Sequence, residues 1–339
     1  MSSHIKQIKR ILLFFAIILG LYLLKVLSSL IIPLVLAFFI SLLLYPIIKW
    51  LTTKRVPYWA SVIISILLVY LIVDITVISI SSSMSDFTNH KEELTAQAIN
   101  KLAPVLKLTD HYLMMDFSAI YEQVAPFIIK NLPTDVVFEF AGNAFLTTLY
   151  LIFILTGNIL KTEKNIRLII SNDEASNEWV DVYREIRKSI TKYMIVKGVI
   201  SLLTGLGYTL ACYAFGVKFA PLWGFLAFLL NFIPNVGSLI ATVPPLLLGW
   251  LEIETTTLLF VYASVLIAVQ QVFGNIIEPY WMGKSFSLNT IAVLFGLVLC
   301  TFIWGIIGAV LAVPILVFIK IILQHIPSAG VFARLLENH

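Results

Sequence analysis

Long apolar segments recur along this chain from Ile11 to Phe318, and they constrain its fold more than any other feature. A helix needs about 20 mainly apolar residues to cross a hydrocarbon core ~30 Å thick. Of the 339 residues, 60% are hydrophobic and only 12% are charged, whereas soluble domains carry roughly 25% charged residues. The sequence therefore predicts an all-α, polytopic transmembrane protein with small helical extramembrane segments.

The apolar segments predict about eight crossings. Residues 1–85 account for three of them, because residues 11–48 span about 57 Å as a helix, close to two crossings, and a third begins after Pro57. A fourth crossing covers residues 139–160, and residues 196–323 form a C-terminal core followed by a tail, residues 324–339. Within that core, residues 222–251 and 288–323 are each either one kinked crossing or a re-entrant pair.

Two polar blocks interrupt the apolar pattern. Residues 86–138 are rich in acidic residues and predict a small helical domain outside the membrane. Residues 161–195 are rich in charges of both signs and predict an amphipathic segment, whose apolar side holds Trp179, Val182, Ile186 and Ile190. We expect this apolar stripe to contact a neighbouring subunit or the lipid surface.

Basic residues predict the orientation of the chain. The N-terminal basic residues, the basic loop near Lys49 and the 161–195 segment all fall on one side of the predicted crossings. By the positive-inside rule, that side is cytoplasmic, and the 86–138 domain faces outward. Both termini are then cytoplasmic, in a multi-pass protein embedded in a lipid bilayer.

The C-terminal core contains two breaks that flank a polar run. The breaks are Asn231–Gly237 and Trp304–Gly308, and the polar run between them is Gln270–Pro279. Broken helices at membrane depth persist only where protein or a watery cavity satisfies their backbone groups, and such breaks mark binding sites in transporters. The candidate hinge residues are Pro234, Pro244, Pro279, Gly283, Gly305 and Gly308.

The polar run carries side chains suited to a hydrophilic ligand. Helical spacing places Gln271, Asn275 and Glu278 on one face, which offers donors, acceptors and a titratable carboxylate. Glu278 and the intramembrane Asp74 are candidates for proton or cation coupling. The alternatives are a capped helix end at the membrane interface for the polar run, and a plain turn for the first break. The candidate substrate-binding residues are Asn231, Asn235, Gly237, Gln270, Gln271, Asn275 and Glu278.

The two broken segments also resemble each other at an offset of 70 residues. Matching pairs include Phe232 with Phe302 and Pro244 with Pro314. Internal repeats with a site at their interface are a common plan in transporters.

Other site classes find no support in the sequence. The five histidines do not cluster, so we expect no metal site, and no nucleophile–base pair or phosphate-binding loop is present. The two cysteines lie in apolar runs, and the net charge of +4 does not suggest a nucleic-acid partner. We therefore expect a protein that is not an enzyme and needs no cofactor.

The ordered motifs resemble a known family. They are the run Asn231–Gly237, the run Asn275–Pro279 followed by Gly283-Lys284-Ser285, and Gly305-Ile306-Ile307-Gly308 followed by Pro314. Together they resemble the autoinducer-2 exporter family of bacterial membrane proteins, over most of the chain. The resemblance implies export of small solutes, with the quorum-sensing signal autoinducer-2 as the namesake, from the bacterial inner membrane. It also implies a homo-oligomer, and some members are associated with sodium/proton antiport.

Three functions follow as hypotheses. The first is export of a small hydrophilic solute by alternating access, and the second is a cation/proton antiporter that depends on Glu278. The third is a membrane scaffold that transports nothing and acts through the two polar segments. A scaffold does not require polar residues at broken helices, so the sequence favours the transporters.

Overall fold

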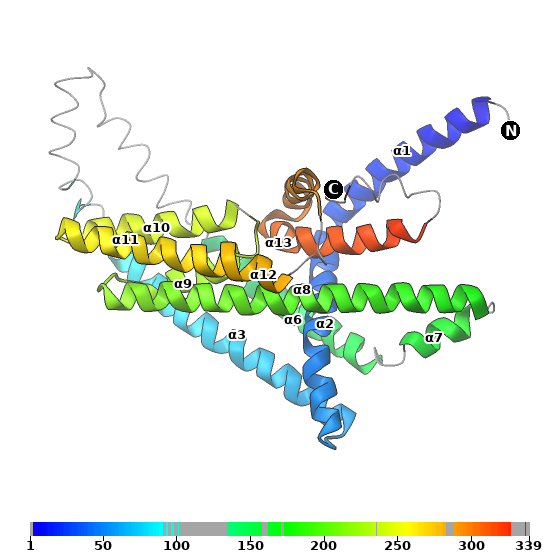
Figure 1. Ribbon diagram of the computed structural model, residues 1–339, viewed down its shortest axis with the longest axis horizontal. Helices are drawn as coiled ribbons and strands as arrows, with labels where there is room; N and C mark the ends of the chain where they lie inside the picture. The colour runs from blue at the N-terminus through cyan, green and yellow to red at the C-terminus, as the bar shows by residue number, and fades with distance from the viewer. Residues whose placement is uncertain are drawn as a thin grey trace. The chain divides into compact units, whose positions relative to one another are not determined.

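The computed structural model describes residues 3–90, 93, 96, 97, 101, 134–157, 162–170, 173–234, 236–282, 288–326 and 336. Within these ranges the chain is helical almost throughout and contains no strand, so the predicted all-α class is confirmed (Figure 1). Four described helices are long and apolar enough to cross a membrane: Ser28–Thr53, Asn177–Ala214, Thr256–Met282 and Thr290–Gln324. Together with shorter apolar helices they confirm a polytopic membrane protein.

The N-terminal part begins with three helices, α1 (Ser3–Val26), α2 (Ser28–Thr53) and α3 (Tyr58–Asn89). Only Leu27 separates α1 from α2, beside the lysine and serines where the sequence predicts a turn. Two further helices follow, α6 (Thr134–Thr156) and α7 (Thr162–Ile169). The Tyr58 hydroxyl donates to the Leu155 carbonyl at 2.5 Å and so connects α3 to α6.

Among the described helices, α8 (Asp173–Ala214) is the longest, with 42 residues. At 1.5 Å per residue it is about 63 Å long, roughly twice the thickness of a hydrocarbon core. It joins the predicted 161–195 segment and the predicted fifth crossing without a break. The boundary at residue 195 therefore lies inside one helix, because the change in composition there includes no residue that ends a helix.

The first break in the C-terminal core is a turn between two packed helices. Helix α9 (Ala220–Leu230) and helix α10 (Val236–Glu252) pack against each other on either side of residues 231–234. Helix α9 has 11 residues, or about 16 Å, which is too short to cross a ~30 Å core alone. Of the two predicted alternatives, the structure has the folded-back pair.

The second break lies inside α13 (Thr290–Gln324). Trp304 has φ −125° and ψ 16°, and Gly305 has φ 61° and ψ −144°, a conformation that favours glycine. The two arms of α13 fold back on each other, because a methyl group added to Gly296 would meet the Leu316 side chain, 20 residues away in the sequence. Despite its length, α13 is therefore a hairpin and not one straight crossing.

The two hairpins agree with the predicted repeat. The first turn contains Pro234, and the non-helical residues of the second are Trp304 and Gly305. Pro234 and Trp304 are 70 residues apart, the same offset at which the two segments align. The similarity in sequence therefore corresponds to a shared local structure.

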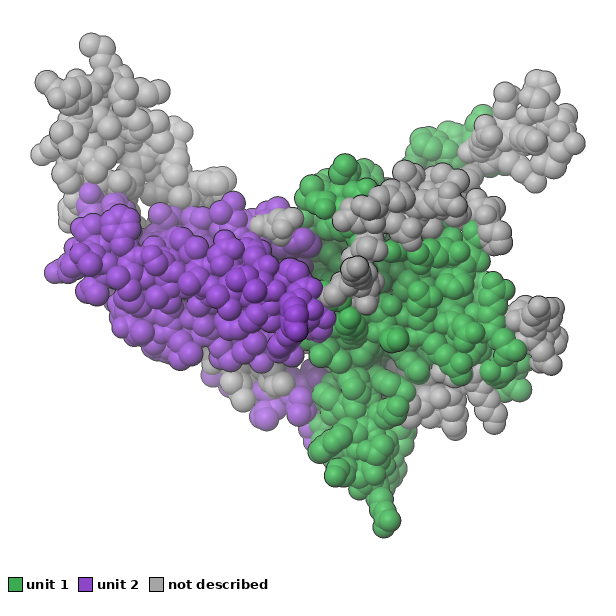
Figure 2. Space-filling model, in the orientation of Figure 1, with its two compact units in different colours: residues 1–66, 141–195, 282–339 green, residues 67–140, 196–281 purple. Residues whose placement is uncertain are grey.

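The chain forms two compact units, which Figure 2 colours separately. Unit 1 comprises residues 1–66, 141–195 and 282–339, and it contains the α13 hairpin. Unit 2 comprises residues 67–140 and 196–281, and it contains the α9–α10 hairpin. Helix α8 continues from unit 1 into unit 2.

The predicted apolar stripe on α8 is largely covered by the chain's own unit 1. Val182 is 2% exposed, Ile186 9% and Ile190 0%, whereas Trp179 remains 46% exposed. The expectation that this whole stripe faces a neighbouring subunit or lipid is wrong, because its apolar side chains form part of the core of unit 1. Only the end near Trp179 stays open.

Candidate functional site

The predicted polar run forms an unusual helix in unit 2. Helix α11 (Thr256–Gln270) continues as a π-helix, η2 (Gln271–Ile277), and then as α12 (Glu278–Met282). Pro279 accounts for this locally, because a proline in an α-helix lacks its N–H and its ring clashes with the carbonyl four residues earlier. That residue is Asn275, inside the wider π-helical turn. Such turns are rare and are frequent at functional sites.

The run meets the first hairpin through a chain of amides. The Asn231 amide donates from Nδ2 to Ser201 Oγ at 3.0 Å, and Gln270 Nε2 donates to Asn231 Oδ1 at 3.4 Å. Asn231 is the residue after α9 and is 4% exposed. The hairpin turn, α8 and the end of α11 thus converge on one buried amide.

An ion pair between a buried lysine and a partly buried glutamate completes the cluster. Lys197 Nζ on α8 lies 2.5 Å from Glu278 Oε1, and the side chains are 6% and 19% exposed. Burying two charges costs several kcal/mol each before their attraction is counted, so such a pair is weak evidence for stability. Within membrane-spanning helices, ionisable residues are rare and mark transport pathways. The pair is therefore a candidate part of a functional site.

These side chains surround a small cavity of about 110 Å³. A solute larger than this volume requires the cavity to open. The lining residues all belong to unit 2 and are Lys197, Asn231, Ile233, Pro234, Ser238, Gln270, Gly274, Asn275 and Glu278.

Helix α8 contributes a polar stripe beyond the ion pair. Lys197, Ser201, Thr204 and Tyr208 recur at intervals of four, three and four residues, which places them on one helix face. All four are at most 5% exposed, and the Tyr208 hydroxyl lies 2.6 Å from Thr242 Oγ1 on α10. Polar side chains therefore extend from the cavity along the interior of unit 2.

The structure gathers four of the seven predicted substrate-binding residues around the cavity, namely Asn231, Gln270, Asn275 and Glu278. Gln271 does not line it and is exposed, although its Oε1 accepts from Asn275 Nδ2 at 2.6 Å. The predicted face of Gln271, Asn275 and Glu278 assumed α-helical spacing, which the π-helix alters. Asn235 lies outside the described residues.

Gly237 has a packing role beside the cavity. It is buried, and a methyl group added there would collide with the Leu230 carbonyl oxygen. Its missing side chain lets α10 start close to the end of α9, so it shapes the hairpin without lining the cavity.

The remaining predicted residues are more dispersed. Asp74 is exposed on α3 and does not line the cavity, so the structure does not bring it to Glu278. Of the predicted hinges, Pro234 lines the cavity, Pro244 lies within α10 and Pro279 within α12. Gly305 and Gly308 lie at the turn of the α13 hairpin, and Gly283 lies outside the described residues.

Four cavity residues were absent from the prediction: Lys197, Ile233, Ser238 and Gly274. Lys197 stands at the end of a charged block, where a lysine is expected at the membrane surface. Its spacing to Ser201, Thr204 and Tyr208 is the signal that could have identified it. No group of three or more residues able to hold a metal ion occurs in the described part of the chain.

The comparisons with known proteins give one consistent result. The model of the family described as "AI-2E family transporter" matches residues 11–328. A Haemophilus influenzae protein named "Putative transport protein" is 31% identical over 332 residues, which are 95% of this chain and 94% of that protein. The Escherichia coli protein named "AI-2 transport protein TqsA" is 37% identical over 150 residues, 44% of this chain and 43% of its own. Since the family match extends across nearly the whole chain, this protein belongs to the AI-2E family of membrane transporters.

Proposed function

We propose that this protein exports a small hydrophilic solute from bacteria across the inner membrane, and that the solute binds in the cavity of unit 2. The observation that carries the proposal is the buried Lys197–Glu278 pair beside the amides of Asn231 and Gln270. Together these groups offer a cation, an anion, donors and acceptors in the interior of unit 2. A solute with several hydroxyl or carbonyl groups satisfies them.

Entry of such a solute requires the cavity to enlarge. The hairpin turn at Pro234 and the π-helix before Pro279 border the cavity, and both are places where backbone hydrogen bonding departs from the regular α-helical pattern. We propose that these two elements move to open the cavity alternately to each side of the membrane. Broken elements at a central site serve this purpose in other transporter folds.

The ion pair also supports coupling to a proton or another cation. Protonation of Glu278 removes the partner charge of Lys197, and a bound cation competes with Lys197 for the same carboxylate. A cation/proton antiporter is therefore the second candidate function. This proposal depends on Glu278 and Lys197, since Asp74 does not line the cavity.

The face of α11 and η2 supports a homo-oligomer. Within the most apolar 18-residue stretch of Thr256–Met282, only 11% of the residues are buried. The same segment exposes the amides of Gln271 and Asn275. Lipid tails offer no hydrogen-bond partners to exposed amides. Contact of this face with another protein surface is therefore more favourable than contact with lipid tails. We propose that a second copy of the chain contributes to this cover.

Transport into vesicles tests the function. Purified protein is reconstituted, and uptake of labelled solutes is measured with and without a pH gradient. Autoinducer-2 is tested first, because one relative is named an AI-2 transport protein. Glu278→Gln should abolish transport, whereas Glu254→Gln, at an exposed position after α10, should leave it unchanged.

The cation candidate is tested in the same vesicles. Sodium-dependent proton release by the wild type, absent in Glu278→Gln, favours antiport. Unchanged transport of every solute and of protons in Glu278→Gln would reject the site.

A further inference from the structure

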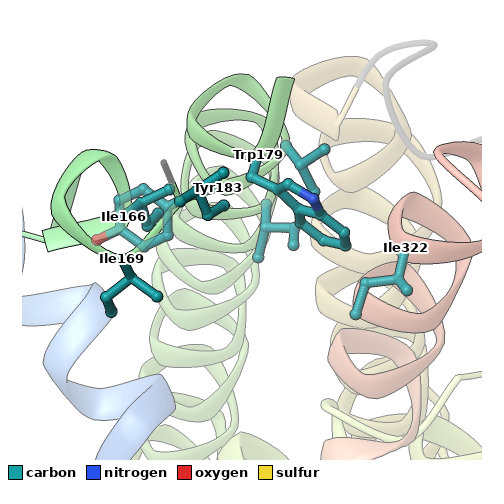
Figure 3. Close-up of a pocket in the computed structure, with 8 residues that line it drawn as sticks. Ile166, Ile169, Trp179, Tyr183 and Ile322 are labelled. Atoms are coloured by element: carbon teal, nitrogen blue, oxygen red, sulfur yellow. The ribbon is translucent and has the colours of Figure 1, made fainter. Parts of the chain in front are cut away.

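A second cavity, in unit 1, has no part in the proposed transport site. Its volume is about 250 Å³, and it lies among α7, α8 and α13 (Figure 3). Ile166 and Ile169 come from α7, Trp179, Val182 and Tyr183 from α8, and Ile322 from α13. Only aliphatic and aromatic side chains line it, so its ligand is a hydrocarbon group.

The surroundings of this cavity resemble the zone where lipid headgroups meet acyl chains. Leu168 is 73% exposed and Ile169 80% exposed on α7, beside the exposed Arg167. A basic helix that exposes apolar residues is typical of one lying in the plane of the membrane surface. Trp179 and Tyr183 belong to the residue types enriched at that level.

Two arginines stand near the cavity. Arg167 lies between lining residues of α7, and the Arg187 guanidinium is 4.8 Å from the ring centre of Tyr45 and 5.5 Å from that of Tyr183, a lining residue. Guanidinium groups bind phosphate oxygens through bidentate hydrogen bonds.

Two acidic residues on the same stretch of α8 lie close to basic side chains, and a third, Glu178, is exposed directly before Trp179. Asp181 lies 3.2 Å from Arg184, and Glu185 lies 3.7 Å from His325. Of these carboxylates, Asp181 is therefore already attracted by an arginine, so it repels an anionic headgroup near Arg167 and Arg187 less than a free carboxylate would.

The shape of the cavity favours a flexible chain over a folded partner. Val182 and Ile186 are already covered by unit 1, so only a narrow part of the apolar stripe stays open. Stable protein interfaces bury about 800 Å² on each partner, which calls for a broad face. A single acyl chain requires only a narrow apolar cavity.

We propose that this cavity binds one acyl chain of a membrane phospholipid, whose phosphate contacts Arg167 and Arg187. Unit 1 then holds a lipid as part of its structure, at the end of α8 that lies away from the transport cavity. This inference does not depend on the proposed substrate or on the coupling ion.

Photolabelling of the full-length protein in detergent tests the proposal. The probe is phosphatidylglycerol with a diazirine at the end of one acyl chain, and labelled residues are located by mass spectrometry. We expect saturable labelling within residues 166–170 and 179–186. A diacylglycerol carrying the same diazirine but no phosphate should label these residues less.

Two matched substitutions on α7 make the test specific. Ile166→Trp fills the cavity, whereas Leu168→Trp adds the same side chain at an exposed position that does not line it. Ile166→Trp should lower labelling about tenfold, the loss expected when roughly two methylene groups no longer fit. Leu168→Trp should label like the wild type. If Ile166→Trp fails to fold, Ile169→Trp at the exposed rim replaces it.

Two results would overturn the proposal. One is labelling spread evenly over exposed apolar residues, with no difference between the two tryptophan variants. The other is a disulfide between two copies carrying Ile169→Cys, with Cys212 and Cys300 replaced by alanine. That result would assign the cavity to a second copy of this chain.

Discussion

Lys197 forms an ion pair with Glu278 in the proposed site. Replacing Lys197 distinguishes the effect of this pair on protein stability from its effect on transport. Lys197→Met leaves the Glu278 carboxylate buried without its cation, so we expect a loss of about 3 kcal/mol in the free energy of unfolding. Replacing both residues, as Lys197→Met with Glu278→Leu, should restore most of that loss but not transport. Thermal melting in detergent measures the first effect, and vesicle uptake measures the second. Normal transport by the double variant would show that the pair has a structural role only.

Residues of the site were predicted best where the signal was local. Asn231, Gln270, Asn275 and Glu278 stand in or beside sequence breaks, and all four line the cavity. Lys197 was missed because its role depends on a contact with a residue 81 positions away. Asp74 was predicted as a site residue but does not line the cavity. A carboxylate in an apolar segment attracts notice, but the sequence does not tell which face of the helix it occupies.

At the scale of elements, the π-helix η2 sets the register between its amides and Glu278. Replacing Pro279 with alanine restores an N–H and removes the ring clash, so the segment gains the option of regular α-helical bonding. We expect Pro279→Ala to lower the transport rate at least about tenfold, the effect of a misplaced binding group, while the melting temperature stays equal or rises. Pro57→Ala, before α3, is the control. Normal transport by Pro279→Ala would show that the π-helical register is dispensable.

The hairpins illustrate what periodicity can and cannot reveal about elements. Glycine, proline and asparagine placed both breaks correctly, since these residues interrupt helices locally. Whether the chain continues or folds back is decided by distant contacts, such as Leu316 against Gly296. No local pattern contains that information, so the sequence is compatible with both alternatives.

For the whole molecule, the charge pattern predicts a topology that labelling can test. Single cysteines at Ser118 and Ser176, in a chain whose native cysteines are replaced, should react differently with an impermeant thiol reagent on intact cells. The positive-inside rule predicts labelling at position 118 and protection at position 176 until the cells are opened. Labelling of both positions in intact cells would overturn the predicted orientation.

The division into two units was not visible in the sequence. The composition changes near residue 195, but a single helix spans that point, and both units combine segments far apart in the chain. Hydropathy indicates which residues avoid water, but it does not indicate which helices pack against each other. The class of the fold therefore followed from the sequence, while the grouping of its helices required the structure.

Exchanging the two charges tests whether the Lys197–Glu278 pair acts directly in transport. Lys197→Glu, Glu278→Lys and the double variant are reconstituted at equal density, and initial uptake of the transported solute is compared with the wild type. Each single variant should be inactive, because two like charges then face each other. The double variant should regain at least about a tenth of the wild-type rate, since the attraction between the two side chains is restored. Wild-type rates in the single variants, or a double variant no better than either, would show that the pair has no direct role in transport.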